Sequence, residues 1–159
     1  MTGTALPHVV INSTSVTTDT TARYSLGHYN NRLIAIDQKN CNSAGAYYSD
    51  DTGRNWTAYT GLPLNTPLLC IASPFEQICL IGTYSGLYKL NVNTGVWEKN
   101  NNGLTGNLIV RNIAFKENIY KNGIRKKYVY LATNLSIFQS LDGGINWTKT
   151  ISGNYITIY

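Results

Sequence analysis

Hydrophobic and polar residues alternate in short runs along most of the chain, and segments rich in Gly, Asn, Asp and Ser separate the runs. Residues 66–91, "TPLLCIASPFEQICLIGTYSGLYKLN", predict a strand, a turn, a second strand, a Gly-containing loop and a third strand. Residues 107–140 repeat this plan with a longer first turn, and residues 24–49 repeat it with a longer loop before the third strand. The pattern predicts an all-β chain.

Two polar turns in this pattern have identical spacing. Ser49-x-Asp51-x-Gly53-x-x-Trp56 matches Ser140-x-Asp142-x-Gly144-x-x-Trp147, and an aromatic residue precedes each Trp by nine positions. Asp and Ser side chains accept hydrogen bonds from turn amides, and Gly supplies backbone freedom. Trp is then free to pack across the sheet. We therefore interpret each motif as a stapled hairpin turn.

A third, degenerate copy lies between the two. Tyr88 precedes Trp97 by nine positions, but hydrophobic residues and Thr94 replace the Ser, Asp and Gly, and Asn93 to Gly95 offer a different hairpin turn. Successive Trp residues are 41 and 50 positions apart. Periods of this length, without a helical pattern, are typical of propeller blades.

These motifs resemble the Asp-box (BNR) repeat of the β-propeller superfamily that includes sialidases, sortilin-like receptors and the photosystem II assembly factor. The resemblance implies blades of four antiparallel strands, with the box as the turn between the third and fourth strands. It implies that Asp51 and Asp142 are structural, with acid–base catalysis and a calcium site as the alternatives. We expect Trp56, Trp97 and Trp147 to be mostly buried.

The repeat divides the chain into three blades, and because a propeller needs at least four, we expect the ring to be incomplete in this chain. Either the chain is a piece of a longer protein, or subunits assemble to complete the ring. The expected units are an N-terminal strand or arm (1–19), blade 1 (20–62), blade 2 (63–104), blade 3 (105–153) and the start of a further strand (154–159).

Charge adds one feature to this picture. The net charge is +5, and one loop at 116–127 concentrates basic residues. We expect this loop to join the first two strands of its blade. We interpret it as a solvated hairpin tip, and the alternative is a docking contact with an acidic neighbour such as another subunit, a virion component or an anionic surface; nucleic acid is disfavoured. The basic residues of the loop are Lys116, Lys121, Arg125, Lys126 and Lys127.

Cysteine and histidine usage points to no cofactor or metal. Cys41, Cys70 and Cys79 form no disulfide framework, and the two histidines stand apart. Cys70 and Cys79 are read as buried free thiols, with a bond across a hairpin as the alternative. The N-terminus lacks the pattern of a signal peptide, and no apolar run is long enough to span a membrane.

The sequence does not meet the demands of a sialidase. That activity needs an arginine triad, a Tyr–Glu pair and an Asp acid, yet the arginines are scattered and Glu is scarce. The favoured function is therefore a non-catalytic binding or assembly module without a cofactor. Its partners would be protein subunits, a glycan or an anionic surface, as in a virion component such as a phage tail protein or on an extracellular surface. The alternatives are a segment of a sialidase-like glycoside hydrolase and an assembly factor resembling that of photosystem II.

Overall fold

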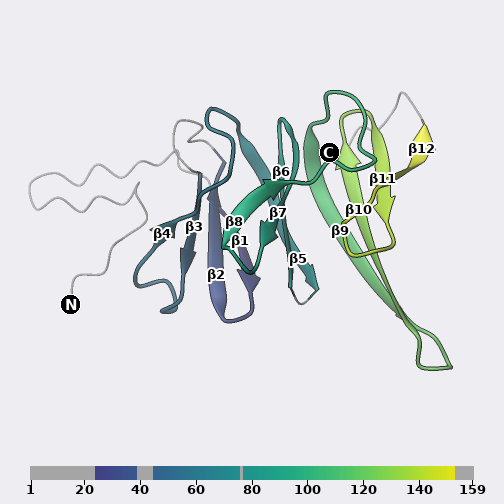
Figure 1. The fold of residues 1–159 in the computed structure, drawn as a ribbon, viewed down its shortest axis with the longest axis horizontal. Helices are drawn as coiled ribbons and strands as arrows, with labels where there is room; N and C mark the ends of the chain where they lie inside the picture. The colour runs from purple at the N-terminus through teal and green to yellow at the C-terminus, as the bar shows by residue number, and fades with distance from the viewer. Residues whose placement is uncertain (1–23, 39–44, 76, 153–159) are drawn as a thin grey trace, which may run out of the picture.

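The computed structural model describes residues 24–38, 45–75 and 77–152, and these residues form twelve β-strands. The strands make three four-stranded antiparallel sheets that stand side by side in chain order (Figure 1). No helix is present among the described residues. The predicted all-β chain of four-stranded antiparallel sheets is therefore confirmed, and the sheets are arranged like neighbouring propeller blades.

Blade 1 contains β1 (Tyr24–Tyr29), β2 (Arg32–Asp37), β3 (Ala46–Ser49) and β4 (Thr57–Ala58), paired in that order. The burial of β2 explains its central place in the sheet, since its last four residues are buried. β4 has only two residues and both are exposed. Blade 1 thus ends in a short edge strand.

Blade 2 contains β5 (Leu68–Phe75), β6 (Ile78–Thr83), β7 (Gly86–Asn91) and β8 (Val96–Lys99). The second strand is again the most buried, with five of its six residues inaccessible to solvent. Side chains on alternate positions of this strand face blade 1 and blade 3. Blade 2 is therefore the central layer of the described structure.

Blade 3 contains β9 (Val110–Ile119), β10 (Arg125–Thr133), β11 (Ser136–Ser140) and β12 (Thr148–Ser152). β9 and β10 form a long hairpin whose turn projects well beyond the other two sheets (Figure 1). Its outer half is mostly exposed and its inner half is packed against blade 2.

Two hydrophobic cores join the three blades. The first lies between blades 1 and 2 and is built from Ile34, Ile36, Ile81 and Trp97 among others. The second lies between blades 2 and 3 and includes Leu80, with Val129, Phe138 and Trp147 from blade 3. Each core therefore receives the Trp of the later blade against the sheet of the earlier one.

The burial of the three Trp residues differs from expectation at one position. Trp97 and Trp147 are only 1 % and 4 % exposed, as predicted. Trp56 is only half-buried. The reason is its place in the array, because no blade precedes blade 1 among the described residues. The expectation that all three are mostly buried is corrected here for Trp56.

The connections between blades place two glycines directly against these Trp residues. A Cβ at Gly61 would lie 2.2 Å from the carbonyl oxygen of Trp97, and a Cβ at Gly103 would lie 2.1 Å from that of Trp147. Both glycines have positive φ angles, 88° and 83°. A side chain at either position would force the blades apart.

The predicted N-terminal arm (1–19), the strand at 154–159 and Cys41 lie outside the described residues. In the part of the chain that the structure does describe, no helix is long and apolar enough to cross a membrane.

Candidate functional site

The hairpin turns within the three blades share one face of the molecule. The β1–β2, β5–β6 and β9–β10 turns lie at the lower edge of the view in Figure 1, as do the β3–β4, β7–β8 and β11–β12 turns. The two repeated polar motifs and the basic loop therefore lie on one face. We call it the turn face.

The β3–β4 turn is held by Ser49 and Asp51. The Ser49 Oγ accepts a hydrogen bond from the Gly53 N–H at 2.9 Å and donates one to the Asp51 Oδ1 at 2.8 Å. Asp51 also accepts bonds from the backbone and side-chain amides of Asn55. The backbone bond from Asn55, then its side-chain bond and that from Ser49, lower the pKa of Asp51 to about 2.

The β11–β12 turn repeats this geometry. The Ser140 Oγ accepts from the Gly144 N–H at 2.8 Å, and the Asp142 Oδ1 accepts from the N–H groups of Ile145 and Asn146. Partial desolvation raises the pKa of Asp142, but the bonds from Asn146 and Ser140 outweigh it and lower the pKa to about 2. At neutral pH both aspartates are ionised and are too weakly basic for efficient proton transfer.

The degenerate turn of blade 2 uses a residue that the sequence interpretation missed. The side chain of Asn91 accepts hydrogen bonds from the N–H groups of Asn93 and Thr94. The Asn91 carbonyl accepts from the Gly95 N–H at 2.8 Å, and Gly95 has a φ of 71°. An Asx turn therefore replaces the motif, shifted by one residue from the expected Asp position. The Asn followed by Gly95 four residues later was the available signal.

The basic loop is the tip of the β9–β10 hairpin, as expected from its place between the first two strands of blade 3. Arg125 lies 3.7 Å from Glu117 across the hairpin, and the Lys126 ammonium lies 5.6 Å from the Tyr120 ring centroid. Lys127 lies 4.9 Å from the ring centroid of Phe75 in blade 2. All five cations of the loop, including Lys116 and Lys121, are exposed.

A pocket of about 510 Å³ separates this hairpin from the Asp142 turn. It is lined by Arg125 to Tyr128 of the hairpin, by Leu141 to Gly143 of the turn and by Ile78 of blade 2. The structure therefore brings the predicted docking residues beside one of the two complete motifs. The second motif, at Asp51, lies in blade 1 and takes no part in this pocket.

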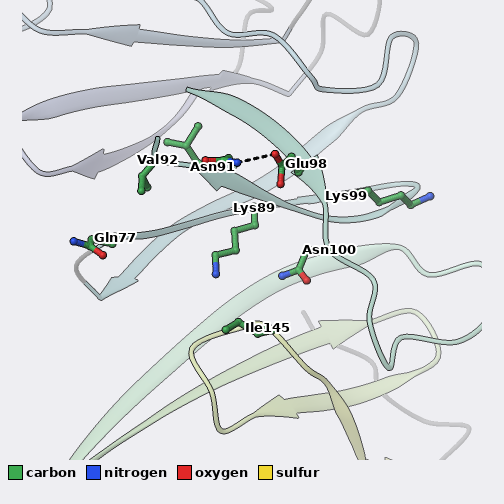
Figure 2. A pocket seen from close by; sticks show the side chains of 9 residues that line it. Gln77, Lys89, Asn91, Val92, Glu98, Lys99, Asn100 and Ile145 are labelled. Atoms are coloured by element: carbon green, nitrogen blue, oxygen red, sulfur yellow. Dashed lines mark hydrogen bonds between the residues drawn. The ribbon is translucent and has the colours of Figure 1, made fainter. Parts of the chain in front are cut away.

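A second pocket, of about 330 Å³, opens between blades 2 and 3 (Figure 2). Lys89 and Ile145 lie on its two sides, and the Glu98 carboxylate accepts a hydrogen bond from Asn91 at 2.8 Å. Glu98 is the single carboxylate among its lining residues. Glycoside hydrolysis normally uses two carboxyl groups that flank the substrate, so this pocket lacks the geometry for that chemistry.

The two described cysteines and Arg32 are not available for catalysis, because the thiols are buried and Arg32 is held in an ion pair. Burial raises the pKa of both Cys70 and Cys79 to about 12, and both thiols are free. Such thiols are poor nucleophiles. The Arg32 guanidinium donates to both carboxylate oxygens of Asp50, at 2.7 and 2.8 Å, and stacks on Tyr48. The hydrogen bond to Asp50 raises the pKa of Arg32 above its ordinary value.

The described residues contain no group of three His, Cys, Asp or Glu side chains that could hold a metal ion. The carboxylate oxygens of the two motif aspartates face Ser and Asn groups of their own turns. The carboxylate oxygens that a calcium site would use as ligands therefore already accept hydrogen bonds within their own turns.

Comparison with known proteins adds information on the fold alone. No protein-family model matches the chain, and no curated protein does. Among solved structures, the extracellular domain of a hybrid two-component system from B. thetaiotaomicron is similar, with a TM-score of 0.61 and 19 % identity over 83 % of this chain. A GH74 xyloglucanase from Xanthomonas campestris has a TM-score of 0.53 and 16 % identity over 76 % of this chain. The chain spans 17 % and 19 % of these two proteins.

Proposed function

We propose that the protein is a non-catalytic binding module, a run of propeller-like blades that docks an acidic partner through the basic β9–β10 hairpin. The observation that carries this proposal is the pocket between the hairpin cations and the Asp142 turn. Isolated exposed charge pairs contribute little, so several cations that act together are needed for docking. The hairpin supplies five within twelve residues.

The chemistry of the remaining groups supports a binding function over catalysis. Asp51 and Asp142 have pKa values of about 2 and are held by their own turns. The described residues show no carboxylate pair in either pocket of the turn face and no activated thiol. The finer assignments to a virion component or an assembly factor remain predictions from the sequence.

Binding of the chain to a surface that carries immobilised heparin tests the proposal, since heparin is a dense polyanion. We expect the wild-type chain to bind in low salt and a variant with Arg125, Lys126 and Lys127 replaced by Ser to lose most of the binding. A control variant with Lys89, Lys99 and Lys149 replaced by Ser loses the same charge elsewhere. Equal weakening of both variants would show that net charge alone is responsible.

A glycoside hydrolase segment is the second candidate, because the fold resembles part of a GH74 xyloglucanase. Incubation of the chain with xyloglucan, followed by a reducing-end assay, separates the two functions. We expect no release of reducing ends. Turnover that disappears in a Glu98→Gln variant would replace the binding proposal with a catalytic one.

A further inference from the structure

The β9–β10 hairpin carries apolar side chains at its tip, away from both hydrophobic cores. The turn of this hairpin projects well beyond the other two sheets (Figure 1). Ile119, Tyr120 and Ile124 lie at the tip and are 65 %, 44 % and 52 % exposed. The corresponding turns of blades 1 and 2 hold polar residues instead, at positions 30–31 and 76–77. The exposed apolar tip is therefore a feature of blade 3 and not of the repeat.

Packing between blades does not reach this tip. The outermost contacts of the hairpin with blade 2 are made to Phe75, by the Phe115 ring at 5.9 Å between centroids and by the Lys127 ammonium at 4.9 Å. Ile119 lies further out along the hairpin. A blade of the size of blade 2 on the other side of blade 3 would leave the tip uncovered as well.

The backbone of the tip makes its own hydrogen bonds. The Tyr120 N–H donates to the Ile124 carbonyl and the Gly123 N–H donates to the Tyr120 carbonyl, both at 2.9 Å. The Asn122 side chain accepts a hydrogen bond from the Ile124 N–H at 3.2 Å. Backbone groups without partners oppose the transfer of a segment from water to lipid. These bonds lower the cost of placing the turn at a lipid surface.

The five cations of the loop surround the apolar tip. Arg125 is the cross-strand partner of Ile119, and Lys121 lies in the turn itself. Glu117 is the single carboxylate in the segment 116–127. Long cationic side chains can lay their stems along apolar surface and keep their charged ends among polar groups. Apolar side chains flanked by cations are the combination that binds anionic membrane surfaces.

The small size of the apolar tip favours a lipid bilayer over a folded protein as the partner. A stable protein interface buries roughly 1,200–2,000 Å² in total, which three side chains at the end of a hairpin do not supply. A polyanionic glycan would pair with the cations but offers no apolar surface to the isoleucines. A bilayer accepts single apolar side chains, and Tyr is favoured at the level of its headgroups.

We infer that the hairpin tip inserts Ile119 and Ile124 into the surface of an anionic membrane, with the five cations of the loop among the lipid headgroups. This inference rests on the proposed function and deepens it by naming the acidic partner as a bilayer that contains anionic lipid. The tip enters only the boundary between headgroups and acyl chains, so the three blades stay in water.

Co-sedimentation with lipid vesicles tests the inference. We expect the chain to bind vesicles of equal parts phosphatidylserine and phosphatidylcholine in low salt, and to bind vesicles of phosphatidylcholine alone much more weakly. Replacing Ile119 and Ile124 by Ser should weaken binding to the anionic vesicles at least about tenfold, because both side chains leave water on insertion. This double variant keeps all five cations, so we expect its binding to heparin to be unchanged.

The matched control replaces Leu64 and Leu135 by Ser. These side chains are 65 % and 48 % exposed, close to the values at the tip, and neither lies on the hairpin. We expect the control variant to bind anionic vesicles as the wild type does. Circular dichroism spectra and melting temperatures show whether both double variants are folded.

The outcomes separate the inference from the proposed function. Equal vesicle binding by the wild type and the Ile119 and Ile124 variant would overturn the inference, because charge alone would then hold the chain on the membrane. A wild-type chain that binds heparin but no vesicles would also overturn it, and would leave the proposed function standing with a soluble polyanion as the partner. A chain that binds neither heparin nor vesicles would overturn both.

Discussion

At the scale of single residues, Asp142 shows how one side chain organises a turn. Its Oδ1 accepts two backbone N–H groups and the Ser140 hydroxyl, and its Oδ2 accepts the Asn146 amide. We expect Asp142→Ala to lower the free energy of unfolding by about 1–2 kcal/mol, as the loss of a capping side chain does. Urea denaturation measures this change. Ile145→Ala, at an exposed residue of the same turn, should have little effect.

The pKa of the same residue predicts a pH dependence. The folded-state pKa of about 2 lies below the ordinary value of 3.8, so the ionised form stabilises the fold. This stabilisation is complete above the ordinary pKa and is lost as the pH falls toward 2. We expect the stability difference between wild type and Asp142→Asn to shrink over that range. A difference that stays constant down to pH 2 would contradict the assignment.

Single-residue interpretation succeeded where a motif is complete and was incomplete elsewhere. The spacing from Ser140 to Trp147 was sufficient to predict a turn, since the hydrogen bonds are local. Asn91 was missed because its side chain caps the turn from a position outside the repeated pattern. The half-buried state of Trp56 could not be predicted either, because burial depends on a neighbouring blade and not on the motif.

At the scale of elements, the connection between blades 2 and 3 is closely packed and therefore sensitive to substitution. Gly103 has a φ of 83°, and a Cβ there would lie 2.1 Å from the Trp147 carbonyl oxygen. We expect Gly103→Ala to cost about 3 kcal/mol through backbone strain and overpacking. Gly123→Ala is the matched control, because Gly123 has a φ of 78° and open space around it. Equal melting temperatures for the two variants would contradict this account.

The strands themselves were predictable from alternation, and the junction glycines were not. Segments such as 66–91 carry enough apolar residues at alternate positions to specify β5, β6 and β7. Gly61 and Gly103 are each followed by Leu at a similar distance from the preceding Trp, a repeat that is visible in the sequence. The repeat did not predict that each glycine packs against the Trp of the next blade, because a contact between different blades cannot be inferred from spacing alone.

At the scale of the whole molecule, the described residues form three blades in sequence, with one hydrophobic core between blades 1 and 2 and another between blades 2 and 3. Blade 2 is covered on both faces, and Leu80, Ile81 and Leu87 are fully buried. Local opening should therefore start in the outer blades. We expect amide hydrogens of β6 and β7 to exchange at least about tenfold more slowly than those of β1. Equal protection in all three sheets would show that the array unfolds as one unit.

The direction of the Trp contacts also has a consequence for biosynthesis. The backbone carbonyls of Thr60 and Asn102 accept hydrogen bonds from the backbone N–H groups of Trp97 and Trp147, which come later in the chain, so each acceptor leaves the ribosome before its donor. A nascent blade thus finds the platform for its Trp already made, and folding can follow translation from blade 1 onward. In the reverse order, Trp97 and Trp147 would stay exposed to water until the blade that buries them had been synthesised. The fold is suited to being made in one direction.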